Sequence, residues 1–277
     1  MPSDAAPMRV TLLGTGTSTG VPVIGCTCRV CRSADPHDRR TRCACYIKAA
    51  GLGLIIDTGP DFRRQMLREK IERVDAVLFT HHHFDHVVGL DDMRPYFFEN
   101  RKPMPCYARA NTAAVLRRMF PYIFERDGSY PGAPPLDLYE VDAPFEIESR
   151  YEPRPPVPVV PVEVYHGQML MYGYRLGRFA YLTDTNRIPE SSFALLEDLD
   201  VLVLDALRRT PHPTHFTIDE AVETARRIGA RQTYLIHMTH NILHAEEDAL
   251  LPDDVALGYD GLSFEVQGST FKVSYKL

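Results

Sequence analysis

The chain has 277 residues, of which 44% are hydrophobic and 25% are charged, a composition typical of a globular domain. Its formal net charge of -6 argues against a surface that is basic overall, as a general nucleic-acid binder would need. The sequence has no apolar run of the roughly 18–20 residues that span a bilayer. It also has no apolar export signal near Met1, so we expect a cytoplasmic location and no membrane partner.

Short apolar runs that end in a polar residue predict most of the strands. In chain order, we expect strands at residues 8–13, 52–56, 74–79, 179–182, 201–204 and 233–236. Helices are expected at residues 62–70 and 217–228, the second opened by a Thr217–Glu220 capping box and closed by Gly229. The proline-interrupted stretch 157–165 is typical of an edge strand. The chain is therefore predicted to be a mixed α/β protein.

Polar residues with metal-binding or acid–base chemistry follow the predicted strands directly. They are Asp57, His81, His166, Asp184, Asp205 and His237. Sheets that present polar groups at the carboxyl ends of their strands build a site along one edge. A scatter of unrelated turn residues is the alternative, and the sixfold repetition of one pattern argues against it.

The segment His81–His86 has the pattern HxHxDH and carries the strongest chemical signal. His81 and His83 are two residues apart and can share one metal, while Asp85 and His86 can turn toward a second. Imidazole and carboxylate ligands suit Zn²⁺, Mn²⁺ or Fe²⁺. The alternative is a histidine-rich surface loop, which would not explain the further ligand candidates downstream.

Three of the six cysteines, Cys26, Cys28 and Cys31, form a C-x-C-x₂-C motif. Three thiolates this close predict a structural Zn²⁺, which needs a fourth ligand. Residue types alone leave five candidates for that ligand, namely Cys43, Cys45, Cys106, His240 and His244.

The HxHxDH motif, followed in order by His166, Asp184 and His237, resembles the metallo-β-lactamase superfamily. The resemblance covers nearly the whole chain, and it implies an αββα sandwich with a dinuclear metal site on one edge. It also implies a ligand set for each ion. The first metal would take His81, His83 and His166, the second would take Asp85, His86 and His237, and Asp184 would bridge the two.

Two divalent ions that share a water lower its pKa and supply a hydroxide at neutral pH. We therefore predict catalytic roles for Asp85 and Asp184, which would hold the ions around that hydroxide. Asp57 and Asp205 are predicted to orient ligand histidines through the free ring nitrogen. The alternative for both is a turn or cap residue.

The N-terminal segment sharpens the resemblance to the PhnP-like branch of the superfamily, through Gly20-Val21-Pro22 and the cysteine motif that follows. The branch implies a phosphodiesterase acting on small, in some members cyclic, phosphodiesters, and a homodimer. It implies that His240 closes the structural zinc site. It also implies that His215 serves as general acid or phosphate ligand; the alternative is a helix-start residue that packs on Phe216.

We interpret residues 1–277 as a single domain with a proline- and aromatic-rich insertion at about 91–161. This insertion would pack over or beside the site, or elaborate the periphery. Arg39, Arg40 and Arg42 are weak candidates for binding a terminal phosphate. His37 and His212 are expected at the surface, and His244 is expected either at the surface or behind a metal ligand.

Three functions are compatible with these motifs. The first is a phosphodiesterase for a small-molecule substrate. The second is the same dinuclear hydrolase acting on RNA 3′ ends, a thioester or a lactam; the basic arm expected of a tRNA 3′-processing nuclease is not evident, so a nucleic-acid partner is not favoured. The third is a non-catalytic metal-binding protein, which a full set of seven ligands argues against.

Overall fold

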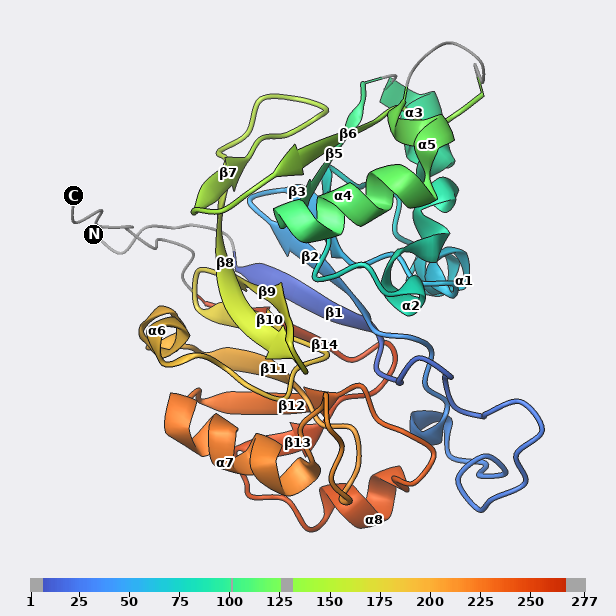
Figure 1. Cartoon of the computed structure of the whole chain (residues 1–277), viewed down its shortest axis with the longest axis vertical. Helices are drawn as coiled ribbons and strands as arrows, with labels where there is room; N and C mark the ends of the chain where they lie inside the picture. Colours follow the sequence, from blue (N-terminus) through green and yellow to red (C-terminus); the bar gives the residue numbers. More distant parts are fainter. Residues whose placement is uncertain (1–6, 101, 126–131, 268–277) are drawn as a thin grey trace.

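Two seven-stranded mixed sheets form the centre of the molecule in the computed structural model, which describes residues 7–100, 102–125 and 132–267 (Figure 1). The first sheet has the order β14-β1-β2-β3-β4-β5-β6 and the second β13-β12-β11-β10-β9-β8-β7. The strands of the first are β1 (Met8–Gly14), β2 (Ala44–Ala49), β3 (Leu52–Ile56), β4 (Ala76–Leu78), β5 (Met104–Ala108), β6 (Leu136–Glu140) and β14 (Ser263–Val266). Those of the second are β7 (Phe145–Ile147), β8 (Val157–His166), β9 (Met169–Leu176), β10 (Phe179–Leu182), β11 (Val201–Asp205), β12 (Gln232–Ile236) and β13 (Val255–Leu257).

Helices cover the outer faces of the sheets. They are α1 (Phe62–Arg68), α2 (Phe84–Val87), α3 (Arg94–Asn100), α4 (Ala110–Met119), α5 (Pro121–Phe124), α6 (Glu190–Phe193), α7 (Ile218–Ile228) and α8 (His244–Asp248), with 3₁₀ turns η1 (Pro36–Asp38), η2 (Val88–Met93) and η3 (Ala194–Leu196). One buried hydrophobic cluster joins the facing sides of both sheets, and two others join each sheet to its helices. This layering is the expected αββα sandwich.

The central strands are apolar on both faces because both faces are covered. Every residue of β3, β10 and β11 is buried, as is typical of strands in a sheet with parallel neighbours. Strands β10 to β13 run parallel, and so do β3 to β6. Parallel strands end at the same edge of a sheet, so the polar residues that follow them are brought together.

Local signals in the sequence place several elements well. The runs predicted at residues 52–56 and 179–182 coincide with β3 and β10, and Thr217 and Glu220 form the capping box of α7. The strand predicted at 74–79 is shorter, since only Ala76–Leu78 pairs with its neighbours.

The proline-containing strand β8 lies inside the sheet order and is not an edge strand. However, β7 pairs only with Val157–Val159 and β9 only with Val160–His166. Each residue of β8 therefore has a partner strand on one side only. Pro158 and Pro161 can face away from that strand with the side of the backbone that lacks an N–H group.

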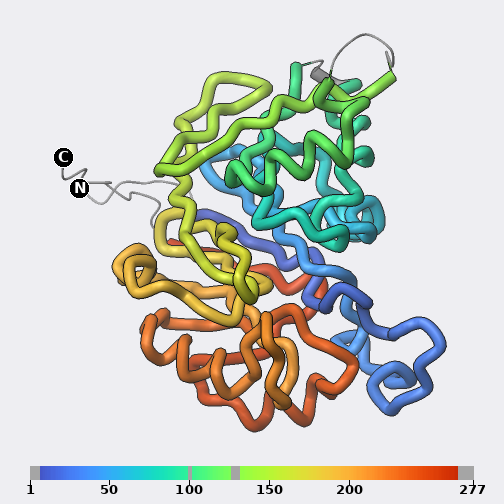
Figure 2. The backbone as a smooth tube through the Cα atoms, in the orientation of Figure 1, coloured from blue at the N-terminus to red at the C-terminus, as the bar shows by residue number. Residues whose placement is uncertain are grey.

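The segment at about 91–161, which we interpreted as an insertion, is built into both sheets. It supplies β5 and β6 to the first sheet and β7 and the start of β8 to the second. Its helix α4 packs in the outer hydrophobic cluster through Ala113 and Leu116. The tube in Figure 2 shows this green segment continuous with the half of the molecule that contains α1 to α3. Within the described residues, no helix is long and apolar enough to cross a membrane.

Candidate functional site

Polar side chains predicted from the sequence gather at one edge of the sandwich. Asp57 follows β3, Asp184 and His237 come shortly after β10 and β12, and Asp205 ends β11. Asp57, Asp184 and His237 have φ angles of 63°, 57° and 65°. Non-glycine residues rarely adopt this left-handed region, and such backbone strain concentrates at functional sites.

Two sets of candidate ligands share the carboxylate of Asp184. The ligand atoms of Asp85, His86, Asp184 and His237 lie within 4.8 Å of one another, and so do those of His81, His83 and Asp184. The Oδ2 atom of Asp184 is 3.2 Å from Nε2 of His86, 3.2 Å from Nε2 of His237 and 3.6 Å from Nε2 of His81.

The donor atoms of these residues fit divalent cations. The buried Nε2 atoms of His81, His86 and His237 have no hydrogen-bond partner among the described residues. An unpartnered buried polar atom is costly. A cation in each of the two ligand sets, between these nitrogens and the Asp184 carboxylate, would satisfy all three. Imidazole and carboxylate donors are the types that Zn²⁺ and Mn²⁺ accept.

His166 lies beside the set formed by His81 and His83. Its ring centroid is 5.0 Å from that of His83 and 5.6 Å from that of His81. Its Nδ1–H donates to the Thr214 carbonyl at 3.0 Å, so Nε2 is left to bind a metal. This hydrogen bond fixes the tautomer that a ligand at this position needs.

Burial keeps several of the ligand histidines neutral. Burial lowers the pKa of His237 to about 3, and it lowers the pKa of His81 and His166 below the usual range. His86 differs: burial alone would lower its pKa, but the carboxylates of Asp184 and Asp57 raise it well above the ordinary value. A metal at His86 must therefore displace a proton.

Two buried carboxylates orient the histidines from behind. Asp57 accepts a hydrogen bond from His86 Nδ1 at 2.8 Å and another from the Thr80 hydroxyl at 2.7 Å. The Thr80 hydroxyl in turn accepts from His81 Nδ1 at 3.0 Å. Both rings are thus held with Nε2 facing Asp184, as the predicted role of Asp57 requires.

Asp205 supports the other side of the site. Its Oδ1 accepts from His215 Nδ1 at 3.1 Å and from the Asp184 backbone N–H at 3.1 Å, and it lies 3.4 Å from His237 Nδ1. Burial raises the pKa of Asp205 to about 6, and the neighbouring His215 opposes this shift.

His215 lies between two ligand candidates. Its ring stacks on His237 with centroids 4.6 Å apart and meets the His166 ring at 4.7 Å. Although burial lowers the pKa of His215, the Asp205 carboxylate raises it above the ordinary value, which favours a protonated imidazole. The position and the charge suit a general acid.

Two residues on the loops around the site were not predicted from the sequence. His212, expected at the surface, is half-buried with its ring centroid 5.1 Å from that of His215. Asn186 hydrogen-bonds to the loops on both sides of it, at Gly167 and Pro213. The i, i+3 spacing of His212 and His215 was the only available signal for the first.

The cysteine motif forms a second candidate metal site. The Sγ atoms of Cys26, Cys28 and Cys31 lie 3.2, 3.6 and 3.6 Å from His240 Nδ1, and the four ligand atoms lie within 4.8 Å of one another. Of the five candidates for the fourth ligand, the structure therefore brings His240 to the thiols. The others are buried elsewhere: Cys43, Cys45 and Cys106 in the hydrophobic clusters, and His244 against His37.

The arginines near this loop have other partners. Arg40 is fully buried and pairs with Asp38 at 3.1 Å, so its expected contact with a substrate phosphate is wrong. Arg42 pairs with Asp61 at 3.1 Å, and Arg39 contacts the Ser33 carbonyl.

A separate cavity of about 580 Å³, lined by residues that include Arg9 and Lys48, contains none of the candidate ligands.

Comparisons with known proteins identify the family and support the fold. A family model for the beta-lactamase superfamily domain matches residues 54–238. A solved structure described as a new diphosphatase from the PhnP family is 43% identical, with a TM-score of 0.85, over 94% of this chain and 97% of that chain. The Zn²⁺-bound PqqB of Methylobacterium extorquens shares the fold, with a TM-score of 0.72 at 19% identity over 93% of this chain and 100% of that one.

A curated octanoyltransferase of Porphyromonas gingivalis is 43% identical over 260 residues. The match covers 92% of this chain but 51% of that protein, so the chain spans about half the length of this relative. The superfamily implies divalent metal binding and hydrolase chemistry. From the family match and the near full-length similarity to the diphosphatase, the chain belongs to the metallo-β-lactamase superfamily and to its PhnP family.

Proposed function

We propose that this protein is a dinuclear metal-dependent hydrolase that cleaves small phosphodiesters. The observation that carries the proposal is the sharing of Asp184 by two sets of ligand candidates, with His215 beside them and hydrogen-bonded to Asp205. The Asp205 carboxylate raises the pKa of His215 above its ordinary value, although burial lowers it. Two cations that share a carboxylate suit the in-line attack of water on phosphorus. A cationic imidazole next to them suits protonation of the leaving oxygen.

When bound, the two metals would lower the pKa of a water and stabilise charge on the phosphoryl oxygens. The residues of the chain supply the rest. Asp57 holds His86 with Nε2 toward the centre, and Asp205 lies 3.4 Å behind His237 Nδ1. His215, held at Nδ1 by Asp205, gives its Nε2 proton to the leaving oxygen as the bond from phosphorus to that oxygen breaks. The water oxygen forms the new bond to phosphorus.

The test is hydrolysis of bis(p-nitrophenyl) phosphate with Mn²⁺ or Zn²⁺ added. We expect metal-dependent turnover that Asp184→Ala and Asp85→Ala abolish while the thermal unfolding of the metal-free protein is little changed. Asp219→Ala is the matched control, because this carboxylate is exposed on α7 and pairs only with Arg209 among the described residues. Retained turnover in both site variants would contradict the proposal.

A thioester is the second candidate substrate, favoured by the similarity to an octanoyltransferase. That name belongs to a whole protein of which about half lies outside the match, so it is the weaker guide. An octanoyl thioester and an RNA with a 3′ extension belong in the same assay. Turnover of either one without phosphodiester turnover would replace the phosphodiesterase proposal.

A further inference from the structure

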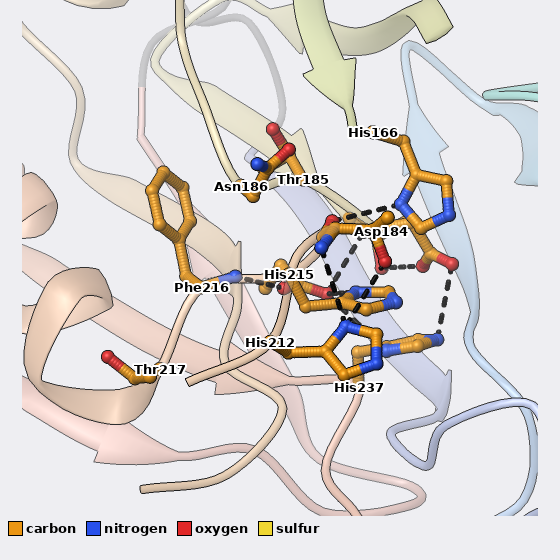
Figure 3. Close-up of polar contacts among 12 residues, drawn as sticks. His166, Asp184, Thr185, Asn186, His212, His215, Phe216, Thr217 and His237 are labelled. Carbon is orange, nitrogen blue, oxygen red and sulfur yellow. Dashed lines mark hydrogen bonds and ion pairs between the residues drawn. The ribbon is translucent and has the colours of Figure 1, made fainter. Parts of the chain in front are cut away.

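Asn186 lies next to Thr185 on the turn that follows Asp184 (Figure 3), and its side chain joins this turn to two other loops that carry candidate catalytic residues. Its Oδ1 accepts from the Gly167 N–H at 2.8 Å, and its Nδ2 donates to the Pro213 carbonyl at 3.0 Å. Its backbone N–H donates to the Tyr165 carbonyl at 3.0 Å. Asn186 thus links the end of β8, the turn after β10 and the loop before α7.

Each of these loops holds one part of the site. Gly167 follows the candidate ligand His166, Asn186 itself lies two residues after Asp184, and Pro213 lies two residues before His215. The Thr214 carbonyl accepts from His166 Nδ1 at 3.0 Å. A shift of residues 213–214 would therefore move the proposed acid and release the hydrogen bond that orients His166.

The chemistry of an amide is specific to this position. Asn186 must accept on one side and donate on the other, and an asparagine amide does both, whereas a carboxylate only accepts. Pro213 is exposed and has no N–H, so its carbonyl is the only backbone hydrogen-bonding group by which it can be held. Beyond it, Phe216 is held by its N–H to the Thr185 carbonyl at 2.9 Å.

We propose that Asn186 is a positioning residue, which places His215 so that it can protonate the leaving oxygen. This inference rests on the proposed function. It predicts a specific dependence on the leaving group. From a nitrophenyl ester, p-nitrophenolate leaves as a stable anion and needs little protonation. From a phenyl ester, the less stable phenolate needs the proton of His215 as its bond to phosphorus breaks.

The experiment compares methyl p-nitrophenyl phosphate with methyl phenyl phosphate in the metal-loaded protein. Asn186→Asp keeps the acceptor for Gly167 but sets a carboxylate oxygen against the Pro213 carbonyl. We expect kcat for the phenyl ester to fall about 10- to 100-fold and kcat for the nitrophenyl ester to change less than about threefold. His215→Ala should show the same pattern, and the double variant should be no slower than His215→Ala alone.

Asn111→Asp is the control. It loses a comparable hydrogen bond, from the Asn111 amide to the Leu170 carbonyl at 3.0 Å, without altering the contacts of residues 213–214. The kinetics are measured with metal in excess, so that a weaker hold on His166 does not empty the site. An equal loss on both esters or additive effects in the double variant would overturn the positioning role. Absence of turnover of either ester by the unaltered protein would instead count against the phosphodiesterase.

A second measurement does not depend on activity. In metal-free protein labelled with ¹⁵N-histidine, the Nδ1–H of His166 that donates to Thr214 should be protected from exchange. We expect Asn186→Asp to abolish this protection and Asn111→Asp to retain it. Unchanged protection in Asn186→Asp would overturn the inference whatever the substrate proves to be.

Discussion

The carboxylate of Asp205 connects the proposed acid to the metal ligands. One oxygen faces His215, His237 and the Asp184 N–H, and the other accepts from the Phe216 N–H at 3.2 Å. A fully buried carboxylate is costly unless its oxygens are partnered, and here three groups donate hydrogen bonds to it, while His237 Nδ1 lies 3.4 Å away. The orientation of His215 therefore depends on this one side chain, which also lies beside His237.

We predict that Asp205→Asn lowers kcat/KM by about 10- to 100-fold, because an amide can accept at only one of the two positions. The loss should fall on kcat as well as on metal retention, measured by steady-state kinetics and metal analysis. Asp200→Asn, at the opposite end of β11 and paired with Arg178, is the control. Equal activity of the two variants would show that Asp205 does not orient the site.

At the scale of elements, the buried ion pair between Arg40 and Asp38 connects the N-terminal loop, which also contains the cysteine motif, to the segment after β12. Arg40 donates to the Ile242 carbonyl at 2.9 Å and pairs with Asp38, which also accepts from the His244 N–H at 2.8 Å. Met238 N–H donates to the Thr15 carbonyl at 3.0 Å. The segment that carries both His237 and His240 is thus held by the N-terminal loop.

Removing one member of a buried ion pair leaves an uncompensated charge. We expect Arg40→Ala to lower the free energy of unfolding by about 3–5 kcal/mol, measured by urea denaturation. Arg39→Ala, at the exposed neighbour, should change it by less than about 0.5 kcal/mol. A cost for Arg40→Ala similar to that of the control would mean that other contacts hold these segments together.

At the scale of the whole molecule, the candidate zinc site joins the first loop of the chain to its last third. Cys26, Cys28 and Cys31 meet His240, which lies three residues after the candidate ligand His237. A hydrogen bond from the Cys31 backbone N–H lowers the pKa of the Cys28 thiol to about 6. Burial raises that of Cys31 to about 11.

These directions predict that zinc binds more tightly as pH rises. The lowered pKa of Cys28 favours its thiolate at pH 7, whereas the raised pKa of Cys31 means that zinc must displace a proton from it. The affinity should therefore rise about tenfold per pH unit for each displaced proton, and more steeply below about pH 6, where Cys28 is also protonated. Competition with a chromogenic chelator, corrected for its own protonation, measures this. An affinity independent of pH would contradict the assignment of these thiols.

The strands β3 and β10 and the start of α7 could be predicted because their signals are local. An unbroken apolar run needs burial on both faces, and a capping box satisfies backbone groups a few residues away. Three other features depend on segments far away in the chain: the burial of Arg40, the ladder partners of β8 and the strands formed by residues 91–161. The local sequence pattern therefore gives little indication of these three features.

The sequence by itself determined the chemistry of the site, since the HxHxDH motif and the acidic residues after apolar strands are fixed by residue type and spacing. Only the tertiary structure decided which groups face one another. It brought His212 beside His215, selected His240 from five possible zinc ligands, and placed Asn186 between two loops. Spacing constrains residues within one turn or strand, whereas contacts between loops arise only when the sheets pack and align their edges.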